Sequence, residues 1–387
     1  MELAITLGPQ EDQVDDGPDT RLFRSPGRIN VIGEHTDYND GFVLPVNTSL
    51  YTTVAATPRE DALIRVMTRT IDEAGEFHLG AYRRNDSPQW LTYVIGVAAE
   101  LDAAGAPLTG ADLDIDSTIP IGGGLSSSAS LELAVARALT GLAGVDIGCE
   151  ELARACQRAE IEFAGVNCGI MDQYSVACGR PGKAMLLDCR SLRPRFVELP
   201  EEVSLVVIDS DVTHQLPESG YNNRADECIA AIRSLRNSGA DVRSLRDVSL
   251  DDLEAHKDEL GDLLYRRARH VVTENSRTLD AFAALGDSDV DRLGALVDSS
   301  HASLRDDYEV SCDGIEALVE LTSRCEGVKG CRMVGGGFGG CVLAIIDKPA
   351  TDAVVDKIGT DYGKVIGRAP WVHVVTPAES AQEISSR

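Results

Sequence analysis

The stretch SPGRINVIGEHTDYNDGFVLP, residues Ser25–Pro45, decides how the rest of this chain is interpreted. Its polar centre brings Glu34, His35 and Asp37 close together in the sequence. Carboxylates accept hydrogen bonds strongly from paired hydroxyl groups, and a site built from them can distinguish one arrangement of hydroxyls from another. Taken alone, the segment DYNDG is also compatible with an Asx-turn, because Asp, Asn and Gly favour such turns. The rest of the chain has to decide between these interpretations.

A second informative stretch is IPIGGGLSSSASLELAVARALTG, Ile119–Gly141. Apolar residues at Leu131, Val135 and Leu139 predict one face of a helix that ends at Gly141. Unpaired backbone N–H groups in a glycine loop and at a helix N-terminus attract anions, so a phosphate is expected there. The loop contains no Lys and is therefore not a Walker A site, but its serine hydroxyls can bind phosphate or Mg²⁺. A glycine turn followed by a Ser N-cap is the alternative.

The next predicted helix carries a carboxylate on its inward face. The spacing of Leu152, Cys156, Ala159 and Phe163 predicts that face, and Glu160 shares it. An inward carboxylate is unfavourable unless a cation pairs with it. Mg²⁺ is the obvious partner beside a phosphate loop, and a salt bridge to a neighbouring Arg is the alternative.

Length and patterning indicate two domains of mixed α and β structure. A chain of 387 residues exceeds one ordinary core. Polar, Pro-containing residues at 193–202 place a boundary near residue 200, and the acidic residues 1–20 are expected to form a flexible lead-in. Strand-like segments that alternate with helical ones are Leu113–Ile115, Ala184–Leu187, Leu205–Ile208 and Val342–Ile346.

Composition limits the partners and the compartment. Hydrophobic residues make up 43 % of the chain and charged residues 26 %, which is ordinary globular usage. No apolar run approaches the roughly 18–20 residues of a membrane span, and the N-terminus does not resemble a signal peptide, so a cytoplasmic protein is expected. The formal net charge of −27 disfavours binding to nucleic acid or to an anionic membrane.

Two further features of the composition lead to expectations. The chain has 6 Lys against 30 Arg, and acid excess with scarce Lys resembles the surface of salt-adapted proteins, although a merely acidic mesophilic enzyme is the alternative. The ten cysteines include no CxxC pair. We therefore expect neither a zinc site nor a redox motif, and interpret the cysteines as small buried hydrophobic residues.

Four segments, in order along the chain, resemble those of the GHMP small-molecule kinases, and in particular the branch of that family that phosphorylates galactose. They are GRINVIGEHTDYNDGFVLP, PIGGGLSSSAS, NCGIMDQ (Asn167–Gln173) and MVGGGFGGC (Met333–Cys341). A fifth, SGYNNRADEC (Ser219–Cys228), is similar to the family's tyrosine segment, but Ala225 follows Arg224 where many relatives have paired Arg. The first segment is highly specific, because the wider family does not share its EHTDYN core.

The resemblance implies roles for individual residues. Asp172 would accept the proton of the sugar C1 hydroxyl as it attacks the γ-phosphate, unless it is only a turn or N-cap carboxylate, and Arg28 would balance charge on the transferring group. Asp37 would recognise the axial hydroxyl of the sugar. The implied sugar-binding residues are Glu34, His35, Thr36, Asp37, Gly169 and Tyr221. The implied nucleotide-binding residues are Gly122, Gly123, Gly124, Leu125, Ser126, Ser127, Ser128 and Thr68, with Ser128 and Glu160 on Mg²⁺.

The resemblance also implies the fold and the ligands. It implies an α+β, two-domain GHMP kinase fold, with a ribosomal-protein-S5-like domain over 21–198, a ferredoxin-like domain over 199–387 and the active site in the cleft between them. The loop Gly335–Gly340 would pack against the site, or would simply be a tight turn between strands. ATP, Mg²⁺ and a small sugar are the implied ligands. We expect a monomer. The alternatives are a sister kinase for N-acetylgalactosamine, galacturonate or arabinose, and a catalytically silent galactose sensor.

Overall fold

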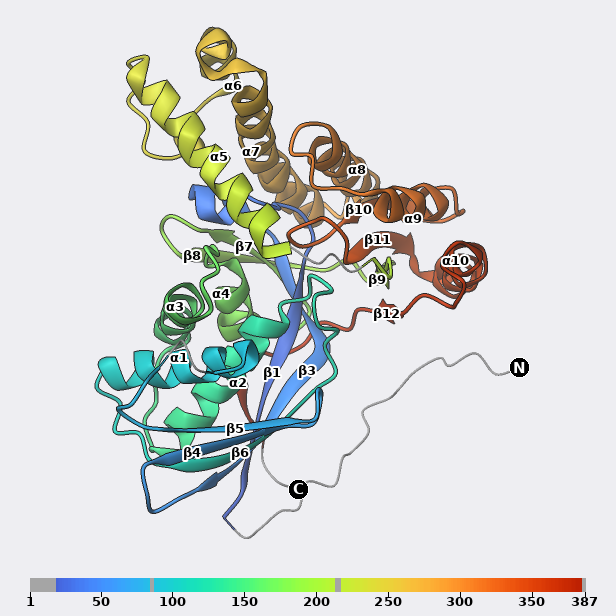
Figure 1. Cartoon of the computed structure of the whole chain (residues 1–387). Coiled ribbons are helices and arrows are strands. Elements are labelled where there is room, and N and C mark those ends of the chain that lie inside the picture. Colours follow the sequence, from blue (N-terminus) through green and yellow to red (C-terminus); the bar gives the residue numbers. More distant parts are fainter. Residues whose placement is uncertain (1–18, 84–86, 213–216, 385–387) are drawn as a thin grey trace.

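The computed structural model describes residues 19–83, 87–212 and 217–384 and has an α+β architecture (Figure 1). Most of the predicted lead-in, residues 1–18, lies outside the described residues. All four segments predicted as strands are confirmed. They lie within β6 (Ala111–Ser117), β7 (Lys183–Asp188), β9 (Val203–Asp209) and β11 (Cys341–Asp347).

A six-stranded sheet organises the first half of the chain, with four helices packed on one of its faces (Figure 1). Across the sheet, the strands are β13 (Gln382–Ile384), β1 (Arg21–Asn30), β3 (Pro45–Pro58), β6, β4 (Leu63–Thr68) and β5 (Glu73–His78). The helices are α1 (Gln89–Ala103), α2 (Ser127–Leu142), α3 (Cys149–Ala159) and α4 (Met171–Cys178). Strand β6 has the sequence ADLDIDS, and its Ala, Leu and Ile are buried while the Asp residues between them are not. This alternation is typical of a strand with one face on the core.

A second, four-stranded sheet organises the other half. Its strands are β10 (Val328–Met333), β11, β9 and β12 (Val372–Val374). The helices of this half are α5 (Pro217–Asn237), α6 (Leu250–Ala255), α7 (Lys257–Gly286), α8 (Val290–Asp306), α9 (Asp313–Ser323) and α10 (Thr351–Ile366). A three-stranded sheet lies beside the two and consists of β2 (Phe42–Val43), β7 and β8 (Arg193–Glu198).

Three hydrophobic clusters form the core, and the third joins the two halves of the chain. It contains Ile29 and Leu44 from the opening segment together with Val207 and Leu343 from the second sheet, all fully buried. Figure 1 shows β1 and β3 reaching from the first sheet toward the second. The segment Ser25–Pro45 therefore runs through the junction between the halves, because its apolar residues supply part of that shared core.

The predicted helices are confirmed with one difference in geometry. The helix expected after the serine loop is α2. The helix that carries Glu160 remains α-helical only to Ala159 and continues as a π-helix over Glu160–Ala164, in which Glu160 is still buried. None of the helices in the described residues combines the length and apolar character that crossing a membrane requires.

The interpretation of the ten cysteines as small buried hydrophobic residues is correct for five of them and wrong for the disulfide pair and for three partly exposed free cysteines. Cys149, at the start of α3, forms a disulfide with Cys178, at the end of α4. The pairing depends on the packing of two helices, which spacing along the sequence does not reveal. Of the eight free cysteines, five are buried and three are partly exposed.

Candidate active site

The centre of the site is an ion pair between β1 and the first turn of α4. Both oxygens of the Asp172 carboxylate accept hydrogen bonds from Arg28 Nη2 at 2.6 Å, and Arg28 Nε donates to Oδ1 at 2.8 Å. The remaining nitrogen, Nη1, donates to the carbonyl oxygen of Gly124 at 2.5 Å. Arg28 is buried, whereas 27 % of the Asp172 side chain is exposed. One guanidinium thus connects the predicted base to the phosphate loop and leaves the carboxylate accessible from outside.

The strand that carries Arg28 touches the phosphate loop through its backbone. A Cβ atom at Gly27 would lie 2.9 Å from the carbonyl oxygen of Leu125, and the Arg28 backbone N–H donates to the same oxygen at 3.1 Å. A β-bulge between Pro26 and Gly27 shifts the register with β3 at this point. A side chain larger than hydrogen at position 27 would therefore separate the strand from the loop.

The predicted phosphate loop, residues 122–128, owes its shape to left-handed backbone conformations. Gly122, Gly124 and Ser126 have φ values of 76°, 74° and 62°. Ser126 precedes α2, its side chain makes no capping bond, and its buried Oγ has no hydrogen-bond partner among the described residues. Ser127 and Ser128 begin the helix. An unpaired hydroxyl and free N–H groups at a helix N-terminus suit an anionic ligand such as a phosphate.

The second glycine loop packs directly on the first, as predicted. A Cβ atom at Gly124 would lie 2.9 Å from the carbonyl oxygen of Val334, and one at Gly335 would lie 2.8 Å from the Cα of Gly124. The loop also connects β10 and β11, which pair antiparallel, so the alternative of a strand-to-strand turn is correct as well. The two interpretations describe one structure, because the hairpin brings its turn against the phosphate loop.

A buried group of carboxylates lies next to the serine loop. Glu160 is 5 % exposed and accepts hydrogen bonds from the Ser128 hydroxyl and from Gln173 Nε2, the latter at 2.5 Å. Gln173 also donates to Glu132, which is completely buried. Burial, reinforced by the charge of Asp172, raises the pKa of Glu160, and burial raises the pKa of Glu132 well above its ordinary value. The alternative salt bridge does not form, since Glu160 pairs with no Arg among the described residues.

The chemistry of this group suits Mg²⁺. The described residues contain no cluster of three His, Cys, Asp or Glu side chains that could hold a metal by itself. Mg²⁺ commonly takes only one or two protein oxygens and completes its shell with water and substrate phosphates. The Ser128 hydroxyl and the Glu160 carboxylate, which are bonded to each other beside the phosphate loop, meet that requirement.

The polar segment of Ser25–Pro45 is tied to the second half of the chain through Glu34. Its Oε1 accepts from Arg332 Nη2 at 2.8 Å and from the Gly335 N–H at 2.9 Å. Arg332 is fully buried and also donates to the carbonyl oxygens of Asn30 and Val31. Glu34 therefore has a structural partner in addition to any ligand.

Asp37 lies in a tight, electronegative environment. It begins the 3-10 helix η1 (Asp37–Asn39), and a Cβ atom at Gly169 would approach its Oδ2 to 2.0 Å. Burial, with the charge of the nearby Asp172, raises the pKa of Asp37 to about 7. The structure thus brings Asp37, Gly169 and Asp172 together, as the prediction requires, and leaves no room for a side chain at position 169.

His35 and Tyr221 lie beside Asp37. Their ring centroids are 5.6 Å apart, and the approach of Asp37 contributes to raising the pKa of Tyr221, after burial as the main cause. His35 has a left-handed backbone (φ 63°) and is buried, and burial lowers its pKa well below 6.5. At neutral pH His35 is therefore an uncharged imidazole.

Two predicted residues stand apart from this arrangement. The hydroxyl of Thr36 is fully buried and lies 2.8 Å from the carbonyl oxygen of Gly33 and 2.7 Å from that of Phe42. Its single hydrogen is thus used inside the turn. Thr68 is the last residue of β4, is buried and pairs with Ile115. No hydrogen bond that we find in the described residues joins Thr68 to the other predicted site residues.

Sequence reasoning missed three residues that shape the site. Arg332 binds Glu34, Glu132 binds Gln173, and the ring of Tyr308 lies 4.7 Å from that of His35. A signal existed for Glu132 alone, since it falls among the apolar residues of a predicted helix. Arg332 directly precedes the segment Met333–Cys341, but nothing in the sequence links it to Glu34, and Tyr308 lies in a segment with no pattern that points to the site.

Known proteins resemble this chain along most of its length. The GHMP kinase N-terminal domain matches residues 92–180, the galactokinase galactose-binding signature matches 11–58, and the GHMP kinase C-terminal domain matches 280–364. A galactokinase of Roseiflexus sp. (strain RS-1) is 44 % identical over 94 % of this chain and 93 % of its own length. One of Chloroflexus aurantiacus is 46 % identical over 91 % of this chain and 90 % of its own.

The solved structures include a close match. The crystal structure of Lactococcus lactis galactokinase complexed with galactose superposes with a TM-score of 0.91 at 36 % identity, covering 95 % of this chain and 96 % of that one. The signature, the extent of the alignments and the superposition all agree. The chain belongs to the GHMP kinases and, within them, to the galactokinase family.

Proposed function

We propose that this protein transfers the γ-phosphoryl group of ATP to the C1 hydroxyl of D-galactose, giving galactose 1-phosphate and ADP. The observation that carries the proposal is the Arg28 guanidinium, which binds both oxygens of Asp172 and the carbonyl oxygen of Gly124. It joins a carboxylate that can receive a hydroxyl proton to a loop suited to phosphate. The relative solved with bound galactose supports the choice of sugar.

The chemistry follows from the placement of these groups. The sugar C1 oxygen forms a bond to the γ-phosphorus while the bond from that phosphorus to ADP breaks, and the hydroxyl proton passes to Asp172. Positioning and electrostatic stabilisation dominate such a transfer. Asp172 aligns the hydroxyl and accepts its proton, and the positive charge of Arg28 offsets the negative charge of the transferring group.

The residues around Asp37 would bind the sugar hydroxyls. Asp37, Glu34 and His35 provide polar atoms, Gly169 leaves the space, and Tyr221 closes one side with its ring. A site that pairs each hydroxyl with a partner rejects epimers, because a misplaced hydroxyl leaves buried polar atoms unpaired.

The two glycine loops and the serines of the loop 122–128 would bind the nucleotide. The loop 122–128 would hold the triphosphate, with Mg²⁺ bound by Ser128 and Glu160. When bound, Mg²⁺ would neutralise charge on the phosphate oxygens. Gln173 Nε2 donates to Oε2 of the Glu160 carboxylate, which also accepts a hydrogen bond from Ser128.

An assay of ADP release over a panel of sugars tests the proposal. Galactose should be preferred over N-acetylgalactosamine, galacturonate and arabinose, and preference for one of these would overturn the assignment. The variant Asp172→Ala should lower kcat by about 10²–10⁴-fold while galactose binding stays measurable by calorimetry. Asp356→Ala, which removes an exposed carboxylate on α10, is the control and should keep full activity. A wild-type rate for Asp172→Ala would refute its role as the base.

The organisation of the chain in solution is part of the same proposal. We place the domain boundary at 198/199, just before β9, with β13 returning to pair with β1 of the first sheet. We propose a cytoplasmic monomer. The eight free cysteines support a reducing compartment, and the Cys149–Cys178 pair is the feature that speaks against it.

A further inference from the structure

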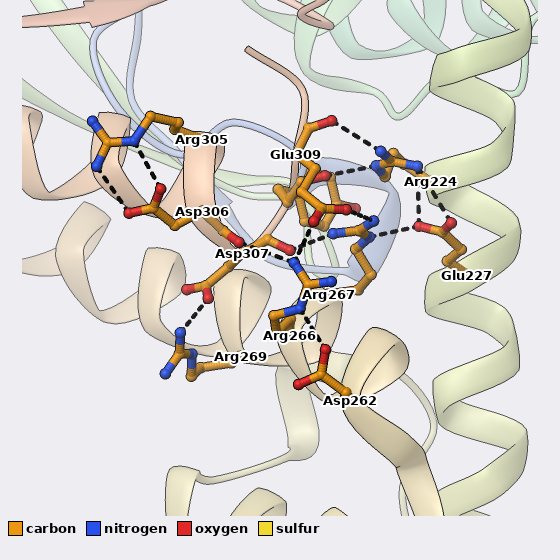
Figure 2. Close-up of polar contacts among 11 residues, drawn as sticks. Arg224, Glu227, Asp262, Arg266, Arg267, Arg269, Arg305, Asp306, Asp307 and Glu309 are labelled. Carbon is orange, nitrogen blue, oxygen red and sulfur yellow. Dashed lines mark hydrogen bonds and ion pairs between the residues drawn. The ribbon is translucent and has the colours of Figure 1, made fainter.

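Arginines from two helices hold the turn that carries Tyr308. Figure 2 shows Arg224 of α5, with Arg266 and Arg267 of α7, around the turn 306–309. Arg224 Nε donates to the carbonyl oxygen of Tyr308 at 2.7 Å. Arg267 Nη1 donates to that of Asp307 at 2.5 Å, and Arg266 Nη1 to that of Asp306 at 3.1 Å. Three consecutive carbonyl groups are thus bound by guanidinium donors, so the backbone of the turn is fixed.

The arginines are themselves held in place by carboxylates. Arg267 has only 2 % of its side chain exposed and pairs with Glu227 at 2.7 Å and with Glu309 at 2.6 Å. Arg224 pairs with the same Glu227. A buried guanidinium that is satisfied on several sides has little freedom to move, because each displacement would break a charge-assisted hydrogen bond.

The fixed turn points the Tyr308 hydroxyl at the sugar segment. Tyr308 is fully buried, and its ring centroid lies 4.7 Å from that of His35 and 4.5 Å from that of His270. Its hydroxyl is 2.8 Å from the Tyr38 hydroxyl, which in turn is 2.8 Å from His35 Nδ1. A chain of hydrogen bonds therefore runs from the arginine-bound turn to the imidazole of the sugar site.

The donor and acceptor roles along these hydrogen bonds are determined at the end farthest from His35. The Asn39 amide lies 3.0 Å from the carbonyl oxygen of His35 and 3.5 Å from Cys228 Sγ. A carbonyl oxygen can only accept, so the Asn39 atom facing it is the nitrogen, and its second hydrogen points to the sulfur. The sulfur of Cys228, which is buried, therefore accepts one hydrogen bond from Asn39.

The thiol hydrogen of Cys228 then has one acceptor. Among the described residues the only other polar atom we find bonded to Cys228 Sγ is the Tyr308 hydroxyl, at 3.2 Å. If the thiol donates to Tyr308, then Tyr308 donates to Tyr38 and Tyr38 donates to His35 Nδ1. The opposite direction would leave the buried S–H with no acceptor. The network is satisfied completely only when Nδ1 of His35 accepts.

A neutral imidazole that accepts at Nδ1 carries its hydrogen on Nε2. In the described residues His35 Nε2 is buried and has no hydrogen-bond partner. It is therefore a buried donor for which the protein supplies no acceptor, in a site shared with Asp37 and Tyr221. A ligand oxygen is the atom that would satisfy it.

We propose that Tyr308, acting through Tyr38, is a positioning residue that fixes His35 as the Nε2–H tautomer and makes it a hydrogen-bond donor to a galactose oxygen. The inference deepens the proposed function and rests on it for the identity of the sugar. The arginine-held turn and Cys228 belong to the same device, because they set the position and the direction of the relay.

The tautomer can be measured without any turnover. Two-bond ¹H–¹⁵N correlation spectra of the full chain, labelled with ¹⁵N-histidine, report which ring nitrogen carries the hydrogen, and a His35→Gln variant identifies the signals. We expect Nδ1 of His35 to be unprotonated and Nε2 protonated in the wild type, and a mixture of tautomers in Tyr308→Phe. A wild-type His35 protonated at Nδ1, or an unchanged tautomer in Tyr308→Phe, would overturn the proposal.

Kinetics supply the second readout. Tyr308→Phe should raise the KM for galactose about 3- to 10-fold, the effect of a single hydrogen bond, with kcat and the KM for ATP within about twofold. Tyr362→Phe is the matched control. Its side chain is also fully buried, and its hydroxyl donates to the carbonyl oxygens of Ser210 and Gly314, outside the relay and the arginine-held turn, so its KM for galactose should not change. Equal KM values for Tyr308→Phe and the wild type would count against the proposal.

The two measurements separate the possible failures. If the wild type does not phosphorylate galactose, the proposed function fails, while the spectra still decide whether the relay sets the tautomer. If it does phosphorylate galactose and the tautomer is the opposite one, only the present inference fails.

Discussion

Replacing Asp37 by Asn should stabilise the ligand-free protein, and by more at pH 8 than at pH 5. Burial, with the charge of Asp172, raises the pKa of Asp37 from its ordinary 3.8 to about 7. The folded protein therefore keeps a proton that the unfolded chain releases between these two values. As the pH rises through this window the wild type loses stability, and the loss is complete above about pH 7. Asn cannot ionise, so the variant does not lose this stability as the pH rises.

The size of the effect follows from the pKa shift. About three pKa units correspond to an upper limit of about 4 kcal/mol at alkaline pH. Asp37 is only half-buried, and water screens it in part, so we expect about 1–2 kcal/mol. Roughly 1 kcal/mol of this should appear between pH 5 and pH 8. For a domain of about 150–250 residues this corresponds to a melting-temperature advantage about 2–4 °C larger at pH 8.

Thermal unfolding followed by circular dichroism at pH 5 and pH 8, without sugar or nucleotide, measures the difference. Asp72→Asn is the control, because Asp72 is exposed and Asn tolerates its left-handed backbone (φ 52°). The control should show the same small shift at both pH values. If Asp37→Asn also shifts the melting temperature equally at the two values, the argument from burial and from Asp172 is wrong.

Three further predictions concern the nucleotide loops and the surface. Glu160→Gln should raise the Mg²⁺ concentration for half-maximal activity about tenfold or more, and an unchanged Mg²⁺ dependence would remove Glu160 from the metal site. Gly124→Ala should weaken ATP binding and lower stability by about 1–3 kcal/mol, since its Cβ would lie 2.9 Å from Val334 O, whereas Gly144→Ala, with a similar φ (68°) but open space, should cost less and leave ATP binding unchanged. With 63 acidic against 36 basic residues, activity should need molar KCl, and full activity with the same melting temperature in dilute buffer would contradict salt adaptation.

The parts of the site that could be predicted from the sequence are those in which one short segment carries a complete chemical pattern. The phosphate loop is an example, because glycines, serines and a helical period occur together and the helix starts at Ser127, directly after the loop. The inward position of Glu160 followed from helical spacing alone and survives the change to a π-helix. The pairing of Arg28 with Asp172 came from the family resemblance, since nothing in either segment identifies the other.

The remaining features could not be predicted, because they depend on contacts between distant parts of the chain. Arg332 reaches Glu34 across 298 positions in the sequence. Tyr308 follows an acidic helix end that looks like any solvent-exposed turn, yet its ring is fully buried against His35 and His270 from distant segments. Cys149 and Cys178 meet because α3 and α4 pack side by side. Local periodicity indicates which face of an element is buried but not which element it faces.

Glu34 links the proposed sugar site to the proposed nucleotide site. Its Oε1 holds the N–H of Gly335, and Gly335 lies against Gly124 of the phosphate loop. Neutralising Glu34 would weaken that bond and leave the fully buried Arg332 without its carboxylate, which is strongly unfavourable. A loss of galactose affinity in Glu34→Gln would therefore combine a lost ligand contact with a displaced glycine loop. Since the second effect also reaches ATP, a parallel loss of ATP affinity would identify it, whereas a loss confined to galactose would identify Glu34 as a direct sugar ligand.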